Sequence, residues 1–285
     1  MGQILDGKQT AQAIRDEIRN KAAAYLQRSG IRPGLAVIMV GDDPASAVYV
    51  RNKERACQEV GFFSETFRLP ADTTQEELES LIDKLNARPD IHGILCQLPL
   101  PSHLNEKAVL LRISPSKDVD CFHPYNVGEL TIGSQKFLPC TPAGCMALLN
   151  RYRIDVDGKK AVVLGRSNIV GKPMALLLLQ QNATVTICHT HTKDLKAICR
   201  EADILVVAIK KPRFITEDYI KEGAVVIDVG INRLENGKLA GDVDFENVFE
   251  KVSYITPVPG GVGPMTITML LQNTLTAALG EPSCN

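Results

Sequence analysis

The sequence predicts an α/β protein built from two α/β domains, the second of which contains a doubly wound parallel sheet, with a cleft between the domains. Three observations support this fold class. Short apolar runs rich in valine and isoleucine, typical of buried parallel strands, recur along the chain of 285 residues. Segments with one polar face, typical of helices, separate these runs. In the second half a strand, a glycine-bounded turn and a helix follow one another directly.

The first half of the chain alternates helices with strands. Residues 10–29 are predicted to form a long helix with Ile14 and Ile18 on its apolar face, and Gly30 can end it. Asp43 is a suitable N-cap for the next helix, and Pro44 is a suitable first helical residue. The predicted strands are residues 35–40, 62–69 and 91–98, and the further helices are residues 44–60, 74–88 and 106–113.

The turn after the strand at residues 161–164 resembles half of a dinucleotide-binding unit. Its glycines, Gly165 and Gly171, would let the backbone approach a pyrophosphate, and the free N–H groups of the following helix would face the phosphate oxygens. The Gly-x-Gly-x-x-Gly pattern itself is absent, because Ser167 stands where its second glycine would be. A turn that closes a strand–helix unit and binds nothing is therefore an open alternative for this segment taken alone.

The segments that follow favour nucleotide binding. They predict a doubly wound, Rossmann-like sheet whose phosphate turn follows its first strand. The further strands are predicted at residues 183–188, 203–209 and 224–229, and crossover helices at residues 193–202 and 216–222.

A helix with Thr141 as its N-cap and Pro142 in its first turn is expected to carry the chain into the second domain. The final helix, at residues 266–279, has no strand after it, so we expect it to return to the first domain and close the cleft together with the first connecting helix. The expected domains are residues 1–138 plus 265–285 and residues 139–264.

Composition excludes several classes of protein. A net charge of −1 is not that of a nucleic-acid-binding surface. The chain begins without an apolar signal core, and no stretch approaches the roughly 18 apolar residues that span a bilayer, so we expect a soluble, cytoplasmic protein without membrane contact. The eight cysteines show no Cys-x-x-Cys spacing and are expected to be reduced core residues, not disulfides or metal ligands.

Lys53 lies in the apolar stripe of the helix that follows Pro44. At about 100° per residue it lies about 40° from Tyr49, between Val60 and Cys57. A lysine at the edge of such a stripe can extend its ammonium into water, which is the alternative explanation. The centre of the stripe is a poor place for this, and a lysine withdrawn from water can serve as an acid or base near neutral pH.

Three other segments are candidates for function, each with a structural alternative. Gln97 falls at the carboxyl end of a strand, where open α/β sheets bind ligands, but it could simply begin a loop. The polar loop at residues 117–126 contains Asp118 and Asp120, which could instead cap turns. The stretch at residues 254–266 combines three prolines and three glycines. It could link domains, lay its backbone against a ligand, or do both.

These residues resemble the motif set of the bifunctional methylenetetrahydrofolate dehydrogenase/methenyltetrahydrofolate cyclohydrolases. The order and spacing match over essentially the whole chain, and the ten-residue last motif is far more specific than a lone glycine pattern. The shared motifs are Tyr49 with Lys53, residues 97–101 (QLPLP), residues 117–120 (KDVD), residues 165–173 and residues 257–266 (PVPGGVGPMT).

The resemblance implies NADP-dependent oxidation of 5,10-methylenetetrahydrofolate, hydrolysis of the methenyl product to 10-formyltetrahydrofolate, a place in one-carbon metabolism and purine biosynthesis, and a homodimer formed through the nucleotide domains. It implies that Lys53 is the acid/base, that Gln97 holds its amine, that Tyr49 packs on the folate and that Asp120 anchors the pteridine. The other implied folate-binding residues are Leu98, Pro259, Gly260, Gly263 and Pro264, and the implied NADP-binding residues are Gly165, Arg166, Ser167, Thr190, Ile231 and Thr141.

The choice of NADP also follows from the residues themselves. An NAD-selecting fold usually has an acid at the end of its second strand, which binds the ribose 2′-hydroxyl and would repel a 2′-phosphate. Here that strand ends at Cys188 and continues with His189, Thr190 and His191, and Arg166 stands in the phosphate turn. We therefore expect NADP to be preferred over NAD.

Two residues depart from the family pattern, since Lys210 and Cys121 stand where glycine is usual. The cation of Lys210 would either crowd the cofactor or pair with its phosphates, and Cys121 leaves the pose of Asp120 open. Two other classes of protein are alternatives to this family. An NADP oxidoreductase of another small substrate would not explain Lys53 or the Pro-Gly stretch. A non-catalytic nucleotide-binding regulator would explain the Gly165 turn alone.

Overall fold

The computed structural model describes residues 2–280, apart from the side chain of Ala45. The described chain forms two compact units, which we name after their sheets. The six-stranded unit contains the residues up to Gln12 together with Thr141–Thr266, and the three-stranded unit contains Ala13–Cys140 together with the residues from Ile267 onward. The first residues of the chain thus group with the later segment, whereas the sequence had suggested that they belong with residues up to 138.

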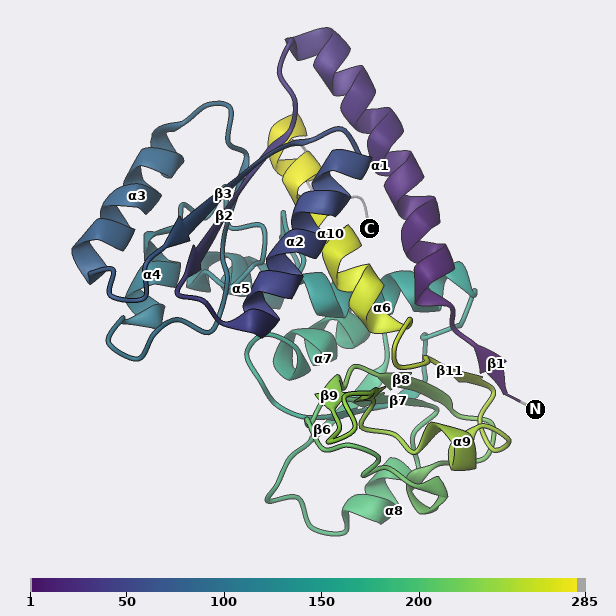
Figure 1. Cartoon of the computed structure of the whole chain (residues 1–285). Helices are drawn as coiled ribbons and strands as arrows, with labels where there is room; N and C mark the ends of the chain where they lie inside the picture. Colours follow the sequence, from purple (N-terminus) through teal and green to yellow (C-terminus); the bar gives the residue numbers. More distant parts are fainter. Residues whose placement is uncertain (1, 281–285) are drawn as a thin grey trace. The chain divides into compact units, whose positions relative to one another are not determined.

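The three-stranded unit has a parallel sheet in the order β3 (Phe63–Leu69), β2 (Gly34–Val40), β4 (Gly93–Cys96). Every residue of the central strand β2 is buried. One face of the sheet packs against α3 (Gln75–Ala87) and α4 (Glu106–Arg112), and α2 (Pro44–Glu59) lies on the other side (Figure 1). This unit is the alternating α/β layer that the sequence predicted.

Local chemistry fixes the ends of these helices. The Asp43 carboxylate accepts a hydrogen bond from the N–H of Ser46 at 2.7 Å, and Pro44 opens α2 as expected. Thr74 and Glu77 form a reciprocal capping box at the start of α3. Gly30 has a φ of 71° and ends α1 (Gly7–Ser29) in the left-handed conformation that glycine adopts without strain.

The six-stranded unit has a doubly wound parallel sheet in the order β1-β11-β8-β7-β5-β6, which confirms the predicted fold class. The chain runs from β5 to β6 on one side of β5 and then to β7 on its other side. Ligands bind open α/β sheets at this kind of reversal, outside the carboxyl ends of the strands. The strands are β1 (Gln3–Ile4), β5 (Lys160–Leu164), β6 (Thr184–Cys188), β7 (Ile204–Val207), β8 (Val225–Asp228) and β11 (Tyr254–Ile255).

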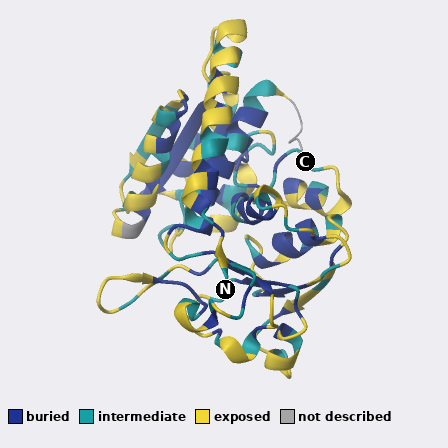
Figure 2. Ribbon diagram, turned by 90° about the vertical axis from the view of Figure 1, so that its right-hand side faces the viewer, coloured by how far each residue is buried: buried dark blue, intermediate teal, exposed yellow. Residues whose placement is uncertain are grey.

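The predicted buried strands form the core of this unit. Alternate residues of β5, β7 and β8 pack into one apolar cluster with α8 (Leu195–Cys199) and the segments around Ile215 and Val248. On the other face, α7 (Gly171–Gln180) packs against β5 and β6. Figure 2 shows the same division, with buried strands and helices that turn one face to solvent.

Several predicted elements were wrong in extent or type. The expected helix at residues 216–222 is a single 3₁₀ turn, η1 (Glu217–Tyr219). Ile215 and Ile220 both enter the same core cluster, and five residues apart they could not lie on one helix face. Thr141 is not an N-cap, because α6 (Cys140–Arg151) already includes it.

Some elements were not predicted at all. The loop at residues 117–126 runs into α5 (Pro124–Ile132), which His123 caps. A hairpin of β9 (Asn232–Arg233) and β10 (Leu239–Ala240), and the short helix α9 (Phe245–Val248), follow β8. The last helix, α10 (Val262–Leu279), begins earlier than expected.

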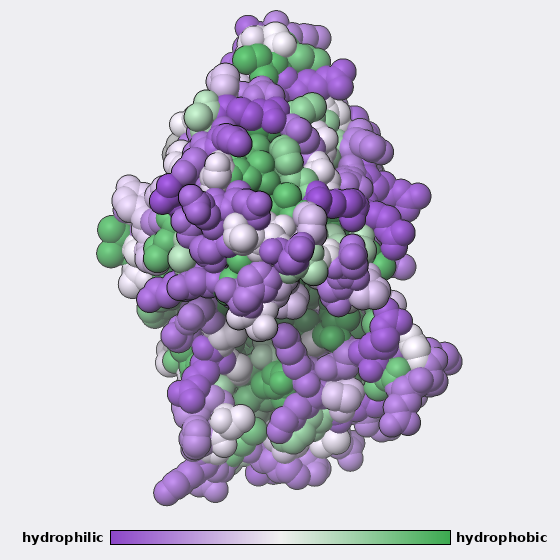
Figure 3. Space-filling model, turned by 60° about the vertical axis from the view of Figure 1, so that its left-hand side comes forward, coloured by the Kyte–Doolittle hydropathy of each residue, from purple (hydrophilic) through white to green (hydrophobic). Residues whose placement is uncertain are grey.

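The surface and the cysteines agree with the composition. Hydrophilic side chains predominate on the face shown in Figure 3, with apolar side chains in smaller groups. Within residues 2–280 no helix is both long and apolar enough to cross a membrane. The seven cysteines in this range are buried and carry free thiols.

Candidate active site

Lys53 and Gln97 meet at the centre of the candidate site in the three-stranded unit. Lys53 projects from α2, and its ammonium Nζ donates a hydrogen bond to Gln97 Oε1 at 2.9 Å. Gln97 follows β4 directly, and its backbone N–H donates to the carbonyl of Ile38 on β2. Its amide Nε2 donates to the carbonyl of Leu98, so the amide oxygen is the atom that faces Lys53. The lysine amine is therefore held by a side chain that the sheet itself positions.

Asp120 completes a charged group with Lys53. Burial raises the pKa of the Asp120 carboxyl, and the ammonium of Lys53 acts in the opposite direction. The carboxyl also receives a weak hydrogen bond from the thiol of Cys140, with Sγ 3.6 Å from Oδ1. Lys53, Gln97 and Asp120, which are distant in sequence, thus share one polar region of the unit.

Asp118 has a structural role, unlike Asp120. Its buried carboxylate accepts hydrogen bonds from the N–H groups of Phe122 and His123 and from the side-chain amide of Asn126. This is the turn-capping alternative that the sequence left open. The turn includes Cys121, whose φ of 62° is in the left-handed region. Glycine adopts this conformation without strain, which explains why glycine is usual at this position. In this chain the hydrogen bonds to Asp118 stabilise the same turn although the residue is cysteine.

Tyr49 and Leu98 flank this group. Tyr49 lies one turn before Lys53 on α2 and is 44% exposed, so its ring is available to a ligand. Leu98 is half-buried and follows Gln97 directly.

A cavity of about 360 Å³ lies in the six-stranded unit at the carboxyl ends of β5, β6 and β7. Gly165, Arg166 and Thr190 line it, as the resemblance implied, and His189 and Lys211 add further basic groups. It lies where the strand order reverses, the usual position of a dinucleotide. No aspartate or glutamate is among its lining residues, which suits the phosphates of a nucleotide.

The helix that follows the Gly165 turn does not offer free N–H groups, so the expected phosphate contact was wrong in its detail. The hydroxyl of Ser167 accepts hydrogen bonds from the N–H groups of Val170 and Gly171, and its carbonyl accepts one from Lys172. Pro173 has no N–H group to offer. Ser167 therefore occupies the N–H groups at the start of α7. An anion at this turn would be bound by side chains such as that of Arg166.

The two glycines of this turn are required by the backbone. Gly165 has a φ of 120°, and a Cβ atom there would lie 2.3 Å from the carbonyl oxygen of Ala208. A Cβ atom on Gly171 would lie 2.1 Å from the carbonyl oxygen of Gly165. These contacts bring the start of α7 against the end of β5 without any Gly-x-Gly-x-x-Gly pattern.

The Pro-Gly stretch lines a smaller cavity of about 150 Å³. Ile231, an expected cofactor residue, lies here and does not line the larger cavity with Gly165 and Arg166. Thr141 lines neither of these cavities, and its hydroxyl pairs with that of Thr266 at 3.0 Å. The expected folate residues Pro259, Gly260, Gly263 and Pro264 all line the smaller cavity.

Sequence reasoning missed a pair of buried aspartates beside these cavities. Asp242 is fully buried and accepts hydrogen bonds from three consecutive N–H groups, those of Ile209, Lys210 and Lys211. Asp228 lines the smaller cavity and accepts the N–H of Asp242 itself. Burial raises the pKa of Asp228 to about 7. The only sequence signal was an acid at the end of an apolar strand.

These bonds also explain the backbone at Lys210. Its φ of 55° is left-handed, which accounts for the glycine usual there, and its side chain is exposed. Lys211, not Lys210, lines the larger cavity.

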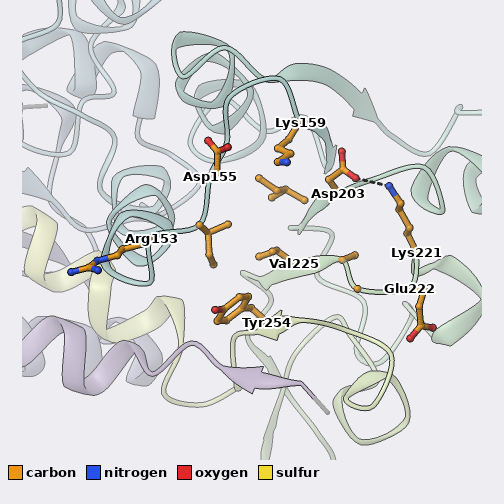
Figure 4. Close-up of a pocket in the computed structure, with 12 residues that line it drawn as sticks. Arg153, Asp155, Lys159, Asp203, Lys221, Glu222, Val225 and Tyr254 are labelled. Carbon is orange, nitrogen blue, oxygen red and sulfur yellow. Dashed lines mark hydrogen bonds and ion pairs between the residues drawn. The ribbon is translucent and has the colours of Figure 1, made fainter.

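A third cavity, of about 370 Å³, lies at the amino ends of the strands and is shown in Figure 4. Asp203 and Lys221 form an ion pair at its wall, and Lys159 and Tyr254 also line it. Open α/β sheets bind their ligands at the opposite edge, so this cavity is not part of the candidate site.

Comparison with known proteins gives a consistent result. Residues 5–120 match the model of the tetrahydrofolate dehydrogenase/cyclohydrolase catalytic domain, and residues 139–281 match that of the tetrahydrofolate dehydrogenase/cyclohydrolase NAD(P)-binding domain. The bifunctional protein FolD of Moorella thermoacetica is 63% identical over 276 residues, which cover 97% of this chain and 98% of that protein.

Solved structures are also similar to this chain. The bifunctional FolD methylenetetrahydrofolate dehydrogenase/cyclohydrolase of Campylobacter jejuni superimposes with a TM-score of 0.96 at 53% identity, covering 98% of this chain and 99% of that one. The corresponding enzyme of Trypanosoma brucei, crystallised with NADP cofactor and an inhibitor, gives a TM-score of 0.94 at 42% identity and covers 98% of both chains.

Proposed function

The chain belongs to the tetrahydrofolate dehydrogenase/cyclohydrolase family, and we propose that it oxidises 5,10-methylenetetrahydrofolate with NADP and hydrolyses the methenyl product to 10-formyltetrahydrofolate. The observation that carries this proposal is the hydrogen bond between Lys53 and Gln97, beside the carboxyl of the half-buried Asp120. A lysine that only extended into water would need no such partner. An acid/base catalyst needs a fixed amine.

In the hydrolysis, water adds to the methenyl carbon of the cationic substrate. The water loses one proton as it adds, and the resulting hydroxyl loses the second as the formyl carbonyl forms. The bond from that carbon to one ring nitrogen breaks, the nitrogen takes up one proton, and one proton is released overall. Lys53 would relay these protons while Gln97 holds its Nζ atom. Asp120 would accept hydrogen bonds from the amino edge of the pteridine, and the exposed ring of Tyr49 would pack on the folate.

In the oxidation, NADP supplies a nicotinamide that accepts a hydride from the methylene carbon of the substrate. The residues that would hold the cofactor are Gly165, Arg166 and Thr190 in the cavity of about 360 Å³ and Ile231 in the smaller cavity, whose Pro-Gly residues would border the folate. The basic side chains that line the cavity of about 360 Å³ favour the binding of a phosphorylated ribose. Hydride transfer requires alignment of two carbons and no protein base at the reacting carbon.

The test is an absorbance assay that follows NADPH and the methenyl compound together, starting from 5,10-methylenetetrahydrofolate. The proposal predicts NADPH formation, followed by loss of the methenyl compound through hydrolysis. An NADP oxidoreductase acting on another small substrate would give no turnover of this folate. A nucleotide-binding regulator would bind NADP without any turnover.

We also propose that the protein acts in the cytoplasm as a homodimer formed through its six-stranded units. The family resemblance supports the dimer. Sedimentation equilibrium would test it, because a single species of about the chain mass would contradict it.

A further inference from the structure

Asn273 is a buried polar residue on α10 that none of the steps above uses. Its side chain is only 3% exposed. Its amide Nδ2 donates hydrogen bonds to two backbone carbonyls at 2.8 Å each, those of Val119 and Leu138. Both hydrogens of the amide are thus committed to the main chain of segments that are far from α10 in sequence.

These two carbonyls flank the candidate site. Val119 directly precedes Asp120, and Leu138 lies two residues before Cys140. The thiol of Cys140 lies 3.4 Å from the carbonyl oxygen of Val119 and 3.6 Å from Oδ1 of Asp120, and it can donate to either. Asn273 Nδ2 is itself 3.7 Å from the Cys140 sulfur. Asn273 therefore connects the backbone of Asp120 to the residue whose thiol contacts the Asp120 carboxyl.

The loop on the other side of Asp120 is held separately. The carboxylate of Asp118 binds the N–H groups of Phe122 and His123. Cys121, between these contacts, is in the left-handed region, so the turn does not keep its shape through local preference. Within the part of the chain that the structure describes, Asn273 and Cys140 are the residues whose side chains hydrogen-bond to the Val119 carbonyl. Burial raises the pKa of the Cys140 thiol well above its usual value, which keeps the thiol a donor.

We infer that Asn273 is a positioning residue for substrate binding, which acts through Val119 and Cys140 to set the direction of the Asp120 carboxyl. This inference rests on the proposed function, in which Asp120 anchors the pteridine. Asn273 itself is buried behind the loop and would not touch the substrate. Loss of its two hydrogen bonds should let the Asp120 carboxyl turn away from its substrate-binding direction.

The experiment compares Asn273→Leu, Asp120→Asn and the double variant. Asn273→Leu removes both donors and keeps the branched shape and the number of side-chain heavy atoms. It should raise the KM for 5,10-methylenetetrahydrofolate by about tenfold to a hundredfold, the loss expected when a charged hydrogen bond is misaligned. The KM for NADP should stay within about twofold, since the hydrogen-bond partners of the Asn273 amide, Val119, Leu138 and Cys140, do not line the nucleotide cavities. Adding Asn273→Leu to Asp120→Asn should raise the folate KM no further.

Thr274→Val is the matched control on the same helix. Thr274 is also buried, and its hydroxyl donates only to the carbonyl of Leu270 within α10. This variant should lower stability without changing the KM for the folate. If Asn273→Leu does not fold, Cys140→Ala and Cys140→Ser test the same connection. Alanine should raise the folate KM, and serine, which keeps a donor, should restore most of the loss.

The outcomes separate the two proposals. If Asp120→Asn leaves the folate KM unchanged, the proposed role of Asp120 fails and the positioning role fails with it. If Asp120→Asn raises the folate KM but Asn273→Leu leaves it unchanged, or adds its full effect in the double variant, Asp120 keeps its role and the positioning role of Asn273 is refuted.

Discussion

Replacing Lys53 by methionine separates the two proposed activities. The unbranched methionine side chain keeps most of the length of lysine and packs against the buried residues of the same face of α2, such as Cys57 and Val60. The amine that donates to Gln97 is lost. The amide oxygen of Gln97 then loses one hydrogen-bond partner. Because Gln97 is only half-buried, this should lower the free energy of unfolding by about 1 kcal/mol, the low end of the range for unsatisfied polar groups.

The catalytic loss should be much larger than the structural one. Removing a positioned acid/base typically reduces the rate about a hundredfold to ten-thousandfold. This corresponds to about 3 to 5.5 kcal/mol on the barrier of the hydrolytic step. Hydride transfer needs no proton at the reacting carbon, so the dehydrogenase rate should fall less and the methenyl compound should accumulate.

Two absorbance assays measure the activities separately. One supplies the methenyl compound and follows its hydrolysis, and the other supplies 5,10-methylenetetrahydrofolate with NADP and follows NADPH. Arg51→Met on the exposed face of the same helix is the control and should leave both rates unchanged. A folded Lys53→Met protein that hydrolyses the methenyl compound at nearly the wild-type rate would refute the acid/base role.

Three further predictions concern the six-stranded unit. Arg166→Ala should weaken NADP by about tenfold to a hundredfold in a direct binding titration and leave NAD nearly unchanged, and equal losses would contradict a contact with the 2′-phosphate. Lys210→Gly should remove the backbone strain of a lysine in the left-handed region and raise the free energy of unfolding by up to about 1 kcal/mol, with little change in the KM for NADP. A large change in that KM would instead indicate that the Lys210 cation contacts the cofactor. Asp228 has a pKa raised to about 7, so it is protonated more readily in the folded than in the unfolded chain, and its contribution to stability is lost as pH rises from about 4 towards 7. Relative to Asp228→Asn, wild-type stability in urea titrations should therefore fall by about 2 to 3 kcal/mol between pH 5 and pH 7, and parallel curves for the two proteins would contradict the raised pKa.

The sequence predicted what is encoded locally. Asp43 with Pro44, and Gly30, set helix ends through bonds within a few residues, so these ends fall where expected. The apolar stripe around Lys53 is likewise a property of one helix. The fixed 3.6-residue period of a helix is enough to place the lysine on its buried face.

What the sequence could not predict depends on contacts between distant segments. The strands β1 and β11 have two residues each and carry no periodicity to recognise. The three N–H groups that bind Asp242 lie about thirty residues earlier in the chain. Ser167 occupies the first turn of α7 through a side-chain geometry that its identity alone does not imply.

The pairing of β1 with β11 has a consequence for how the chain can be divided. Gln3 lies beside Tyr254 in the sheet, and residues from Ile267 onward belong to the three-stranded unit. Neither unit is therefore a continuous stretch of chain. Severing the chain between Cys140 and Thr141 would leave one fragment without its last helix and the other with an unpaired edge at β11, which invites association with other chains. A single crossover in the gene therefore cannot exchange either unit as a whole.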